Sequence, residues 1–244
     1  MTLCAVIPVY NHPRVIGALV AQLRAAGLPC VLVDDGSDAV CAAVLDALAG
    51  PGVALVRHTA NLGKGAAVVS GFRQAAALGH SHALQLDADG QHDLAALPVF
   101  IEAMRARPDA VIAGYPVYDH TVPRIRFYCR YLTHIWVWIN TLSLRIRDSM
   151  CGFRLYPLAP TLALLARTTV GRRMDFDTEI LVRLDWAEVP IVNLPVRVHY
   201  PEHGISHFRM LQDNVLISAM HLRLCLGMLL RAPRLAWRLL RGSR

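Results

Sequence analysis

The stretch that decides the fold is Ala83-Leu84-Gln85-Leu86-Asp87-Ala88-Asp89-Gly90. An apolar run gives way to two carboxylates that stand two residues apart, and a glycine follows them. This pattern is typical of a buried strand with polar residues at its carboxyl end, which is where open α/β sheets bind ligands. Two carboxylates repel each other there unless a cation lies between them or one of them holds a proton. Because Mg²⁺ takes oxygen ligands and usually shares its shell with substrate phosphates, the stretch predicts a metal–diphosphate site.

Strands and helices are expected to alternate around this stretch. The expected strands cover residues 3–9, 30–33, 53–57, 83–86 and 110–113, and the expected helices cover 13–26, 39–49, 65–78 and 94–105. This alternation predicts a doubly wound, mostly parallel α/β sheet. It weakens after Gly114, where a loop is expected over 117–126. Further helices are expected over 127–144, 157–166, 176–187 and about 208–240, with a strand over 189–200.

The composition fits one large α/β domain with a basic extension. The chain has 244 residues, of which 55% are hydrophobic and 18% charged, and its formal net charge is +7. We therefore expect a catalytic domain over 1–208 and a helical tail over 209–244. The six cysteines form no CxxC pair and no set with zinc spacing, which favours reduced packing residues in the cytoplasm. No secretory signal is expected, because no basic segment precedes the first strand.

The C-terminal segment has the pattern of an amphipathic helix. No acidic residue follows Asp213, and Arg231, Arg234, Arg238 and Arg241 recur at helical spacing with leucines opposite them. The pattern predicts a helix that lies on an anionic membrane surface without spanning it, since His221 and Arg223 interrupt the longest apolar run. A terminal helix packed on the domain, with a solvated basic face, is the open alternative. Nucleic acid is not an expected partner, because no aromatic residues are interleaved with the basic ones.

Two strand ends near the N-terminus are candidates for a nucleoside site. Tyr10 and Asn11 follow the first strand, and Asp34 and Asp35 follow the second. A nucleoside needs a flat wall and a few fixed polar groups, which Tyr10 and Asp35 would supply. Ordinary turn chemistry is the alternative interpretation of the Asp-Gly-Ser segment.

A glycine-rich segment precedes the expected third helix. In Asn61-Leu62-Gly63-Lys64-Gly65 the backbone N–H groups can approach a phosphate, and Lys64 adds positive charge. The segment lacks the spacing of a P-loop, and a plain helix-start loop is the alternative.

Carboxylates in the second half of the chain are candidate general bases. Asp148 precedes a Gly-Phe-Arg segment, and Asp177 begins an expected helix. An acceptor hydroxyl would need such a base near the leaving group. Structural pairing, for example of Glu179 with Arg154, is the alternative.

These segments, in this order and spacing, resemble family 2 glycosyltransferases with a GT-A fold, and within them the dolichyl- and polyprenyl-phosphate sugar synthases. The resemblance covers about residues 3–210. It implies a nucleoside diphosphate sugar donor (UDP or GDP) and Mg²⁺ or Mn²⁺ on its diphosphate. The implied nucleotide-binding residues are Pro8, Tyr10, Asn11, Asp34, Asp35, Asn61, Lys64 and Asp87. The implied metal-side residues are Asp87, Asp89 and Gln91.

The acceptor side departs from the family pattern in two places. Polyprenyl-phosphate synthases usually have Gly-Ser-Arg after the fifth strand, whereas this chain has Gly114-Tyr115-Pro116. The closing Gly-x-Ser-Lys-Leu type of segment appears here as Gly204-Ile205-Ser206-His207-Phe208. The expected acceptor-binding residues are Arg126, Arg154, Ser206 and His207. The donor assignment does not depend on either departure.

The implied reaction is a direct, inverting displacement at the anomeric carbon, on a lipid-linked or lipid-like acceptor. Asp177 would take the proton of a hydroxyl acceptor, while a phosphate acceptor needs no base. The expected location is cytoplasmic and peripheral, on the inner face of the cell membrane. Two alternatives remain. One is a phosphatase of the haloacid dehalogenase type, which the Asp87–Gly90 segment superficially fits, and the other is a non-catalytic nucleotide-binding protein of the membrane surface.

Overall fold

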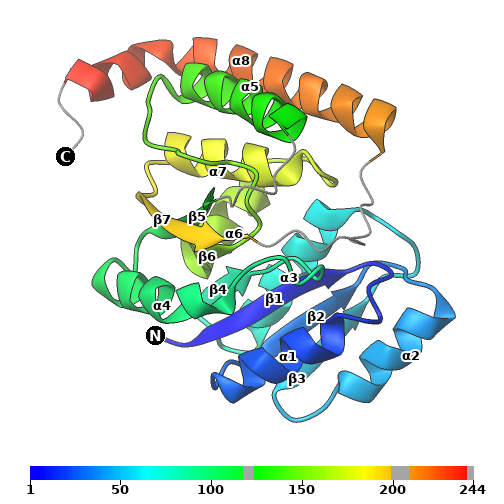
Figure 1. Ribbon diagram of the computed structural model, residues 1–244. Helices are drawn as coiled ribbons and strands as arrows, with labels where there is room; N and C mark the ends of the chain where they lie inside the picture. Colours follow the sequence, from blue (N-terminus) through cyan, green and yellow to red (C-terminus); the bar gives the residue numbers. More distant parts are fainter. Residues whose placement is uncertain (118–123, 199–208, 241–244) are drawn as a thin grey trace.

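The computed structural model describes residues 1–117, 124–198 and 209–240, except for the side chains of 124–129. Within these ranges it contains a seven-stranded sheet in the order β3-β2-β1-β4-β6-β5-β7, with helices on both faces (Figure 1). The strands are β1 (Leu3–Val9), β2 (Cys30–Asp34), β3 (Val53–Arg57), β4 (His82–Gln85), β5 (Val111–Val117), β6 (Arg154–Pro157) and β7 (Ile191–Arg197). The helices are α1 (Ile16–Ala25), α2 (Ala39–Leu48), α3 (Lys64–Ala77), α4 (Leu97–Ala106), α5 (Arg124–Thr141), α6 (Leu158–Arg167), α7 (Phe176–Trp186) and α8 (Met210–Leu240), with a short 3-10 turn, η1 (Leu94–Ala96).

The sheet is parallel except for β6, which runs antiparallel to both β4 and β5. The predicted doubly wound, mostly parallel fold class is therefore confirmed. Because the parallel strands end at one edge, the polar residues that follow β1, β2 and β4 meet there. The first residue of β6, Arg154, lies at the same edge, opposite Gln85 of β4.

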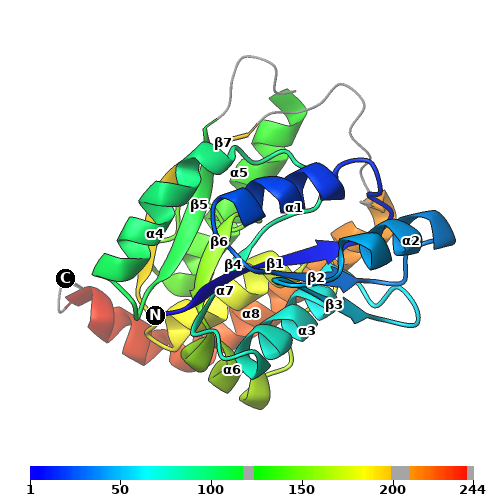
Figure 2. The same cartoon turned by 90° about the horizontal axis from the view of Figure 1, so that it is seen from below.

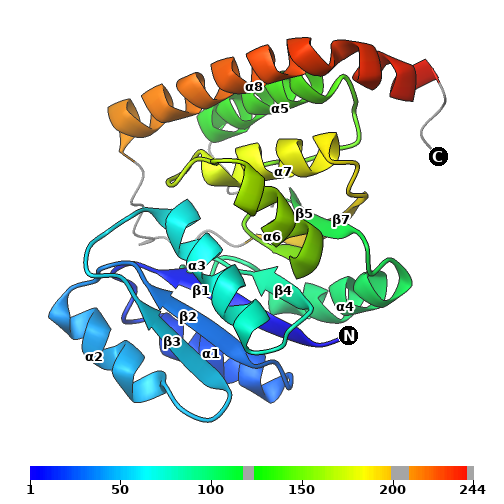
Figure 3. The ribbon, with the colours of Figure 1, turned by 180° about the vertical axis from the view of Figure 1, so that it is seen from behind.

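Helices cover the sheet in unequal layers. One face is covered by α1, α2 and α4 (Figure 2), and the other by α3, α6 and α7 (Figure 3). A further layer lies outside α7, where α5 and α8 run side by side (Figures 1 and 3). Leu224 and Met220 of α8 are fully buried in the same apolar cluster as Leu181 and Leu184 of α7. The long C-terminal helix is thus packed on the catalytic body along part of its length.

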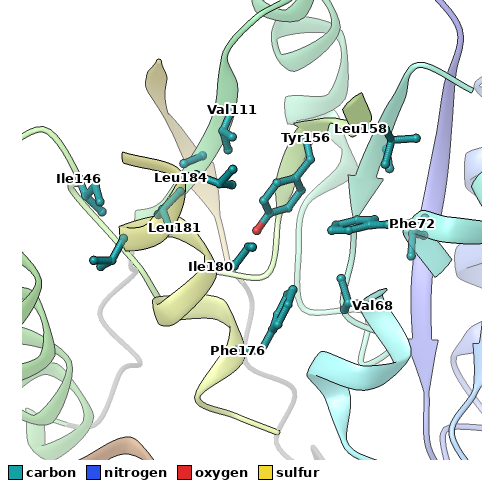
Figure 4. Packing of buried hydrophobic residues seen from close by; sticks show 14 of the residues in the cluster. Val68, Phe72, Val111, Ile146, Tyr156, Leu158, Phe176, Ile180, Leu181 and Leu184 are labelled. Carbon is teal, nitrogen blue, oxygen red and sulfur yellow. The ribbon is translucent and has the colours of Figure 1, made fainter. Parts of the chain in front are cut away.

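Aromatic packing fixes α7 against α3. The rings of Phe72 (α3) and Tyr156 (β6) have centroids 5.0 Å apart, and Phe176 of α7 lies beside them (Figure 4). Burial of one such side chain contributes about 2–3 kcal/mol. The approach requires Gly65, since a Cβ there would lie 2.5 Å from the Cβ of Phe176. The first turns of α3 and α7 are therefore held together, and this contact positions Asp177.

Three elements differ from the sequence prediction. β5 continues to Val117 because β7 pairs with it in parallel along its whole length. The expected loop over 117–126 is shorter, since α5 already begins at Arg124 and 118–123 lie outside the described residues. The C-terminal helices form one helix, α8, that continues through Pro233.

Three arginines of α8 contact residues of the domain, which favours the packed alternative over their predicted membrane-facing role. Arg238 lies 3.1 Å from Asp185, and Arg234 lies 2.9 Å from Glu188. The guanidinium of Arg231 stacks 4.7 Å from the ring centroid of Trp186. Arg241 lies outside the described residues. Helical periodicity places these arginines on one face, but carboxylates at the end of α7 and beyond it determine what that face contacts.

By length and composition, α8 is also able to cross a membrane, whereas the sequence predicts no spanning helix. Its most apolar window has a mean hydropathy of 1.6, and 22% of that window is buried. A long core helix of a soluble protein meets the same criterion. The length and composition of α8 are therefore compatible with a spanning helix and with a helix packed on the domain.

Candidate active site

The carboxylates after β2 anchor the loops around the predicted nucleoside site. Asp35 is buried and accepts hydrogen bonds from His58 Nδ1 (2.8 Å) and from the backbone N–H groups of Leu62 (2.9 Å) and Gly63 (2.8 Å). Asp34 is also buried and accepts from Ser37 N (2.9 Å) and Arg57 Nε (2.9 Å). Both side chains therefore hold the glycine-rich segment and the strand ends in place.

The turn after β1 is built around Asn11. Its backbone has a φ of 56°, and its Oδ1 accepts a hydrogen bond from Asp38 N at 2.8 Å. Pro8 and Tyr10 lie beside it and are partly exposed. Gly36 must be glycine, because its φ is 73° and a Cβ would lie 2.4 Å from the backbone of Ala60. The turns after β1 and β2 thus pack closely, and they leave Pro8 and Tyr10 at the edge of the sheet.

A lysine links the carboxylates after β4 to α7. Lys64 Nζ lies 2.6 Å from Asp87 Oδ1 and 2.7 Å from Asp177 Oδ2. Gln85 Nε2 donates to the other oxygen of Asp177 at 2.7 Å. Burial acts to raise the pKa of the Asp87 carboxyl, but the charge of Lys64 outweighs it and holds that pKa below its ordinary value. At neutral pH the Asp87 carboxylate is therefore ionised and paired with the Lys64 ammonium.

The second carboxylate of the motif is less constrained. Asp89 Oδ1 accepts from the backbone N–H of Gln91 at 3.1 Å, and the side chain is partly exposed. Burial and the neighbouring charge of Asp87 raise its pKa. The backbone at Gly152 closes over Asp87, since a Cβ there would lie 2.3 Å from Asp87 Oδ2. Asp87 and Asp89 are therefore neighbouring carboxylates, and a glycine covers the first of them.

A histidine that the sequence analysis did not single out lies next to these carboxylates. His92 Nε2 is 3.6 Å from Cys151 Sγ. Burial acts to lower the pKa of His92, but its hydrogen bond with Cys151 and the charges of Asp87 and Asp89 raise it to about 9. His92 stands three residues after Asp89. This position at the end of the same motif is the sequence signal that could have identified His92 as a site residue.

Asp148 has a different environment from Asp177. Arg130 donates to both of its oxygens, His134 Nε2 lies 3.3 Å away, and the backbone N–H groups of Met150 and Cys151 donate to it. Burial opposes ionisation, yet His134 and Arg130 hold the pKa of Asp148 far below its usual range. This geometry favours a structural role for Asp148 and leaves Asp177 as the better candidate base. Arg130 and His134 are i, i+4 neighbours on α5 that the sequence analysis did not connect to it.

The predicted acceptor residues are only partly described. Arg154 is fully buried, and its Nη1 donates to the backbone oxygen of Asp177 and to Tyr156 Oη. Arg154 therefore fixes the backbone at Asp177, and its side chain does not reach the surface. The side chain of Arg126 and residues Ser206 and His207 lie outside the described part of the chain.

The acidic site fits a divalent cation that arrives with a diphosphate. No group of three or more His, Cys, Asp or Glu side chains within the described ranges could enclose a metal. Mg²⁺, however, is commonly held by one or two carboxylates together with substrate phosphates. Asp87 and Asp89 provide those carboxylates, and the ammonium of Lys64 against Asp87 shows that the site favours positive charge. Gln91 lies beside them as a further oxygen donor.

Comparison with known proteins places this geometry in a family. Residues 4–170 match "Glycosyl transferase family 2". The chain is 31% identical over 169 residues to a polyprenol monophosphomannose synthase of Mycolicibacterium smegmatis, covering 62% of this chain and 60% of that protein. It is 27% identical over 214 residues to an undecaprenyl-phosphate mannosyltransferase of Micrococcus luteus, covering 84% of this chain and 87% of that protein.

A solved structure supports the fold. The glucosyl-3-phosphoglycerate synthase of Mycobacterium tuberculosis superposes with a TM-score of 0.64 at 15% sequence identity, covering 92% of this chain and 80% of that one. At this identity the likeness concerns the fold alone, which is GT-A. The family match spans more than half of the chain, and the resemblance inferred from the sequence motifs is thereby confirmed. The chain belongs to glycosyl transferase family 2, and the protein is a glycosyltransferase.

Proposed function

We propose that the protein transfers a sugar, with inversion, from a nucleoside diphosphate sugar to a polyprenyl phosphate or a similar lipid acceptor. The observation that carries the proposal is the Lys64 bridge between Asp87 and Asp177. It brings the motif after β4, the glycine-rich segment and the candidate base to one point. The names of the two curated relatives support a polyprenyl phosphate acceptor.

On the donor side, Asp87 and Asp89 would hold Mg²⁺ or Mn²⁺, with Gln91 beside them. When bound, the ion would stabilise the negative charge of the leaving nucleoside diphosphate. Lys64 would contact the same diphosphate, since its ammonium already lies against Asp87. The nucleoside, of UDP or GDP, would rest on Pro8 and Tyr10. Asn11, Asp34, Asp35 and Asn61 would keep that site in shape, because they anchor the surrounding turns.

On the acceptor side, the contacts of Asp177 favour a phosphate nucleophile. One of its oxygens accepts from Gln85 and the other pairs with Lys64. A carboxylate engaged on both oxygens is poorly placed to remove a proton, and an ionised phosphate does not require it. Asp177 therefore positions Lys64 in this mechanism, and it would act as a base only toward a hydroxyl acceptor. Arg126, Ser206 and His207 remain the proposed contacts of the acceptor head.

The proposed acceptor is a lipid, so the enzyme would work as a peripheral protein at the cytoplasmic, inner face of the cell membrane. This location keeps the nucleotide sugar in the cytoplasm and the lipid phosphate at the bilayer surface. Membership of glycosyl transferase family 2 leaves the dehalogenase-type phosphatase without support. The non-catalytic alternative makes a separate prediction, namely binding of nucleotide without turnover.

A donor panel tests the proposal before any acceptor is known. UDP- and GDP-sugars are incubated with the protein and Mg²⁺ or Mn²⁺, and slow donor hydrolysis is measured. Undecaprenyl phosphate is then added to the active donor, and radiolabelled sugar is followed into the organic phase. Metal-dependent hydrolysis that rises to transfer supports the proposal. Nucleotide-dependent thermal stabilisation without any turnover supports the non-catalytic alternative and contradicts the proposed transfer activity.

A further inference from the structure

The outer layer of the molecule exposes an unusual amount of apolar surface. On α8, Leu222, Leu226, Leu230 and Trp237 are all more than half exposed, and on α5 Leu132 and Ile139 are 59% and 40% exposed. The spacings of four, four and seven residues put the α8 side chains on one helical face. α5 and α8 run side by side (Figures 1 and 3), and the exposed apolar side chains of both helices together make up this surface. We call it the α5–α8 face.

This face lies opposite the side of α8 that packs on the domain. Leu224, Met228 and Leu235 of α8 are buried in the core. α8 therefore has two apolar sides, whereas packing on a soluble domain needs only one. Contiguous exposed apolar surface on a protein marks a binding site for a partner or a membrane.

The charges around the α5–α8 face suit an anionic partner. α5 contains no Asp or Glu, and α8 contains only Asp213, which is fully buried. The outermost layer thus presents no carboxylate within the described residues, while the chain as a whole carries +7. Exposed aromatic side chains, Trp136 and Trp237, stand among the leucines. Tryptophan is enriched at the interface between lipid and water.

The contacts of α8 favour a helix that lies along the domain over one that spans a bilayer. Arg223 lies 3.1 Å from Glu179, Arg238 lies 3.1 Å from Asp185, and Arg234 lies 2.9 Å from Glu188. These pairs fasten α8 along α7 and to Glu188, two residues beyond the end of α7. A spanning orientation would break them and place arginines in the hydrocarbon region, which is costly.

We propose that the α5–α8 face docks on the surface of an anionic phospholipid bilayer, with its leucines and tryptophans in the interface and its arginines fastened to α7. The choice of a bilayer rests on the proposed lipid acceptor. α5 also links this layer to the site, because Arg130, on the inner side of α5, pairs with Asp148, and the segment after Asp148 leads to Gly152 above Asp87. Docking through this face brings the lipid side of the reaction next to α5.

Vesicle co-sedimentation of the full chain, without donor or acceptor, tests the proposal. We expect binding to vesicles of phosphatidylglycerol mixed with phosphatidylcholine, and weaker binding to phosphatidylcholine alone. The double variant Leu226→Glu/Leu230→Glu should lose at least about tenfold in partitioning, because two leucines no longer enter the interface. The milder Leu226→Gln/Leu230→Gln variant should also bind vesicles less tightly than the wild type. Circular dichroism of both double variants shows whether the loss of binding occurs in a folded protein.

Two controls separate the α5–α8 face from net charge. Val40→Glu/Leu78→Glu introduces the same charges at exposed apolar positions on α2 and beside α3, and should bind vesicles within about twofold of wild type. Arg234→Gln should also bind within about twofold, because Arg234 pairs with Glu188. Equal losses for both double Glu variants, or no loss for Leu226→Glu/Leu230→Glu, would overturn the proposal.

Three further outcomes distinguish bilayer docking from dimerisation and from the proposed function. A wild-type dimer in light scattering that Leu226→Glu/Leu230→Glu converts to a monomer would assign the face to a second copy of the chain and overturn the bilayer. Donor hydrolysis without vesicle binding would overturn docking alone. Vesicle binding with the expected variant pattern, but without turnover of any nucleotide sugar, would sustain the docking surface and contradict the proposed function.

Discussion

Lys64 and Asp177 form an ion pair of 2.7 Å that joins the first turns of α3 and α7. The same ammonium lies 2.6 Å from Asp87, so one lysine pairs with two carboxylates, the partly buried one of Asp87 and the buried one of Asp177. Without it, Asp87 and Asp177 would repel each other in a region that Phe176 and Gly65 hold tightly packed.

Replacement of Lys64 by methionine should therefore destabilise the fold by about 3 kcal/mol at pH 7, because a buried charge loses its partner. The pH dependence should also change. In the wild type, the lowered pKa of Asp87 contributes stability that is fully present above pH 3.8, the ordinary pKa of an aspartate, and is lost only as the pH falls below it. In Lys64→Met, burial would raise that pKa, so stability should increase as the pH falls from 7 to 5. Urea unfolding at both pH values measures this, with exposed Arg73→Met on the same helix as the control.

Asp89→Ala should abolish metal-dependent turnover while it leaves the fold nearly intact. Asp89 is partly exposed and accepts only one described hydrogen bond, from Gln91 N, so its removal costs little stability. Its loss leaves a single carboxylate for Mg²⁺ or Mn²⁺, which needs oxygen ligands beside the diphosphate. Donor hydrolysis is measured against metal concentration, with exposed Asp109→Ala as the matched control. Turnover at wild-type rate and metal affinity in Asp89→Ala would show that the metal is held elsewhere.

Asp177→Asn separates the two possible acceptors. A general base contributes roughly 10²–10⁴ to a rate, so a hydroxyl acceptor predicts a loss of that size. A phosphate acceptor predicts a loss below about tenfold, caused only by the weaker hold on Lys64. The rate of sugar transfer is compared for the two proteins across pH, once with undecaprenyl phosphate and once with undecaprenol as the acceptor. A rate that loses its dependence on an ionised carboxylate, together with the larger loss, would identify Asp177 as the base.

The sheet and its polar edge could be predicted because the signals are local. The strands β1, β2 and β4 are short apolar runs that lead into Asn11, Asp34 and Asp87, and in a parallel sheet those ends share one edge. The sequence of Asp87, Ala88 and Asp89 therefore indicated both a strand end and a metal-side site. The contact of Lys64 with Asp177 could not be predicted, because the two residues are over a hundred positions apart.

The roles of Asp148 and of the α8 arginines show a second limit. Spacing indicates which residues share a helical face, but the partner of that face depends on packing. Asp185 and Glu188, at the end of α7 and just beyond it, pair with Arg238 and Arg234, and so the basic side of α8 runs along the domain. Arg130 and His134 of α5 enclose Asp148 for the same reason.

The seam between α5 and α8 contains a histidine that should make the fold sensitive to acid. His221 is 8% exposed, its two ring nitrogens have no hydrogen-bond partner in the described structure, and its ring lies 6.0 Å from that of Trp136. Burial lowers its pKa from 6.5 to about 4. The folded state therefore disfavours the proton, and the unfolding free energy should fall as the pH drops from 6.5 toward 4.

Replacement of His221 by leucine should remove this part of the acid sensitivity. A leucine fills the apolar seam without a titratable group, so stability at pH 7 should be unchanged or higher. The wild type should lose about 2–3 kcal/mol more than the variant between pH 7 and pH 4, which corresponds to its pKa difference. Urea unfolding of both proteins at pH 7, 5.5 and 4 measures the two slopes. Parallel slopes would mean that His221 is hydrated or already paired in the folded protein, and that other groups cause the acid sensitivity.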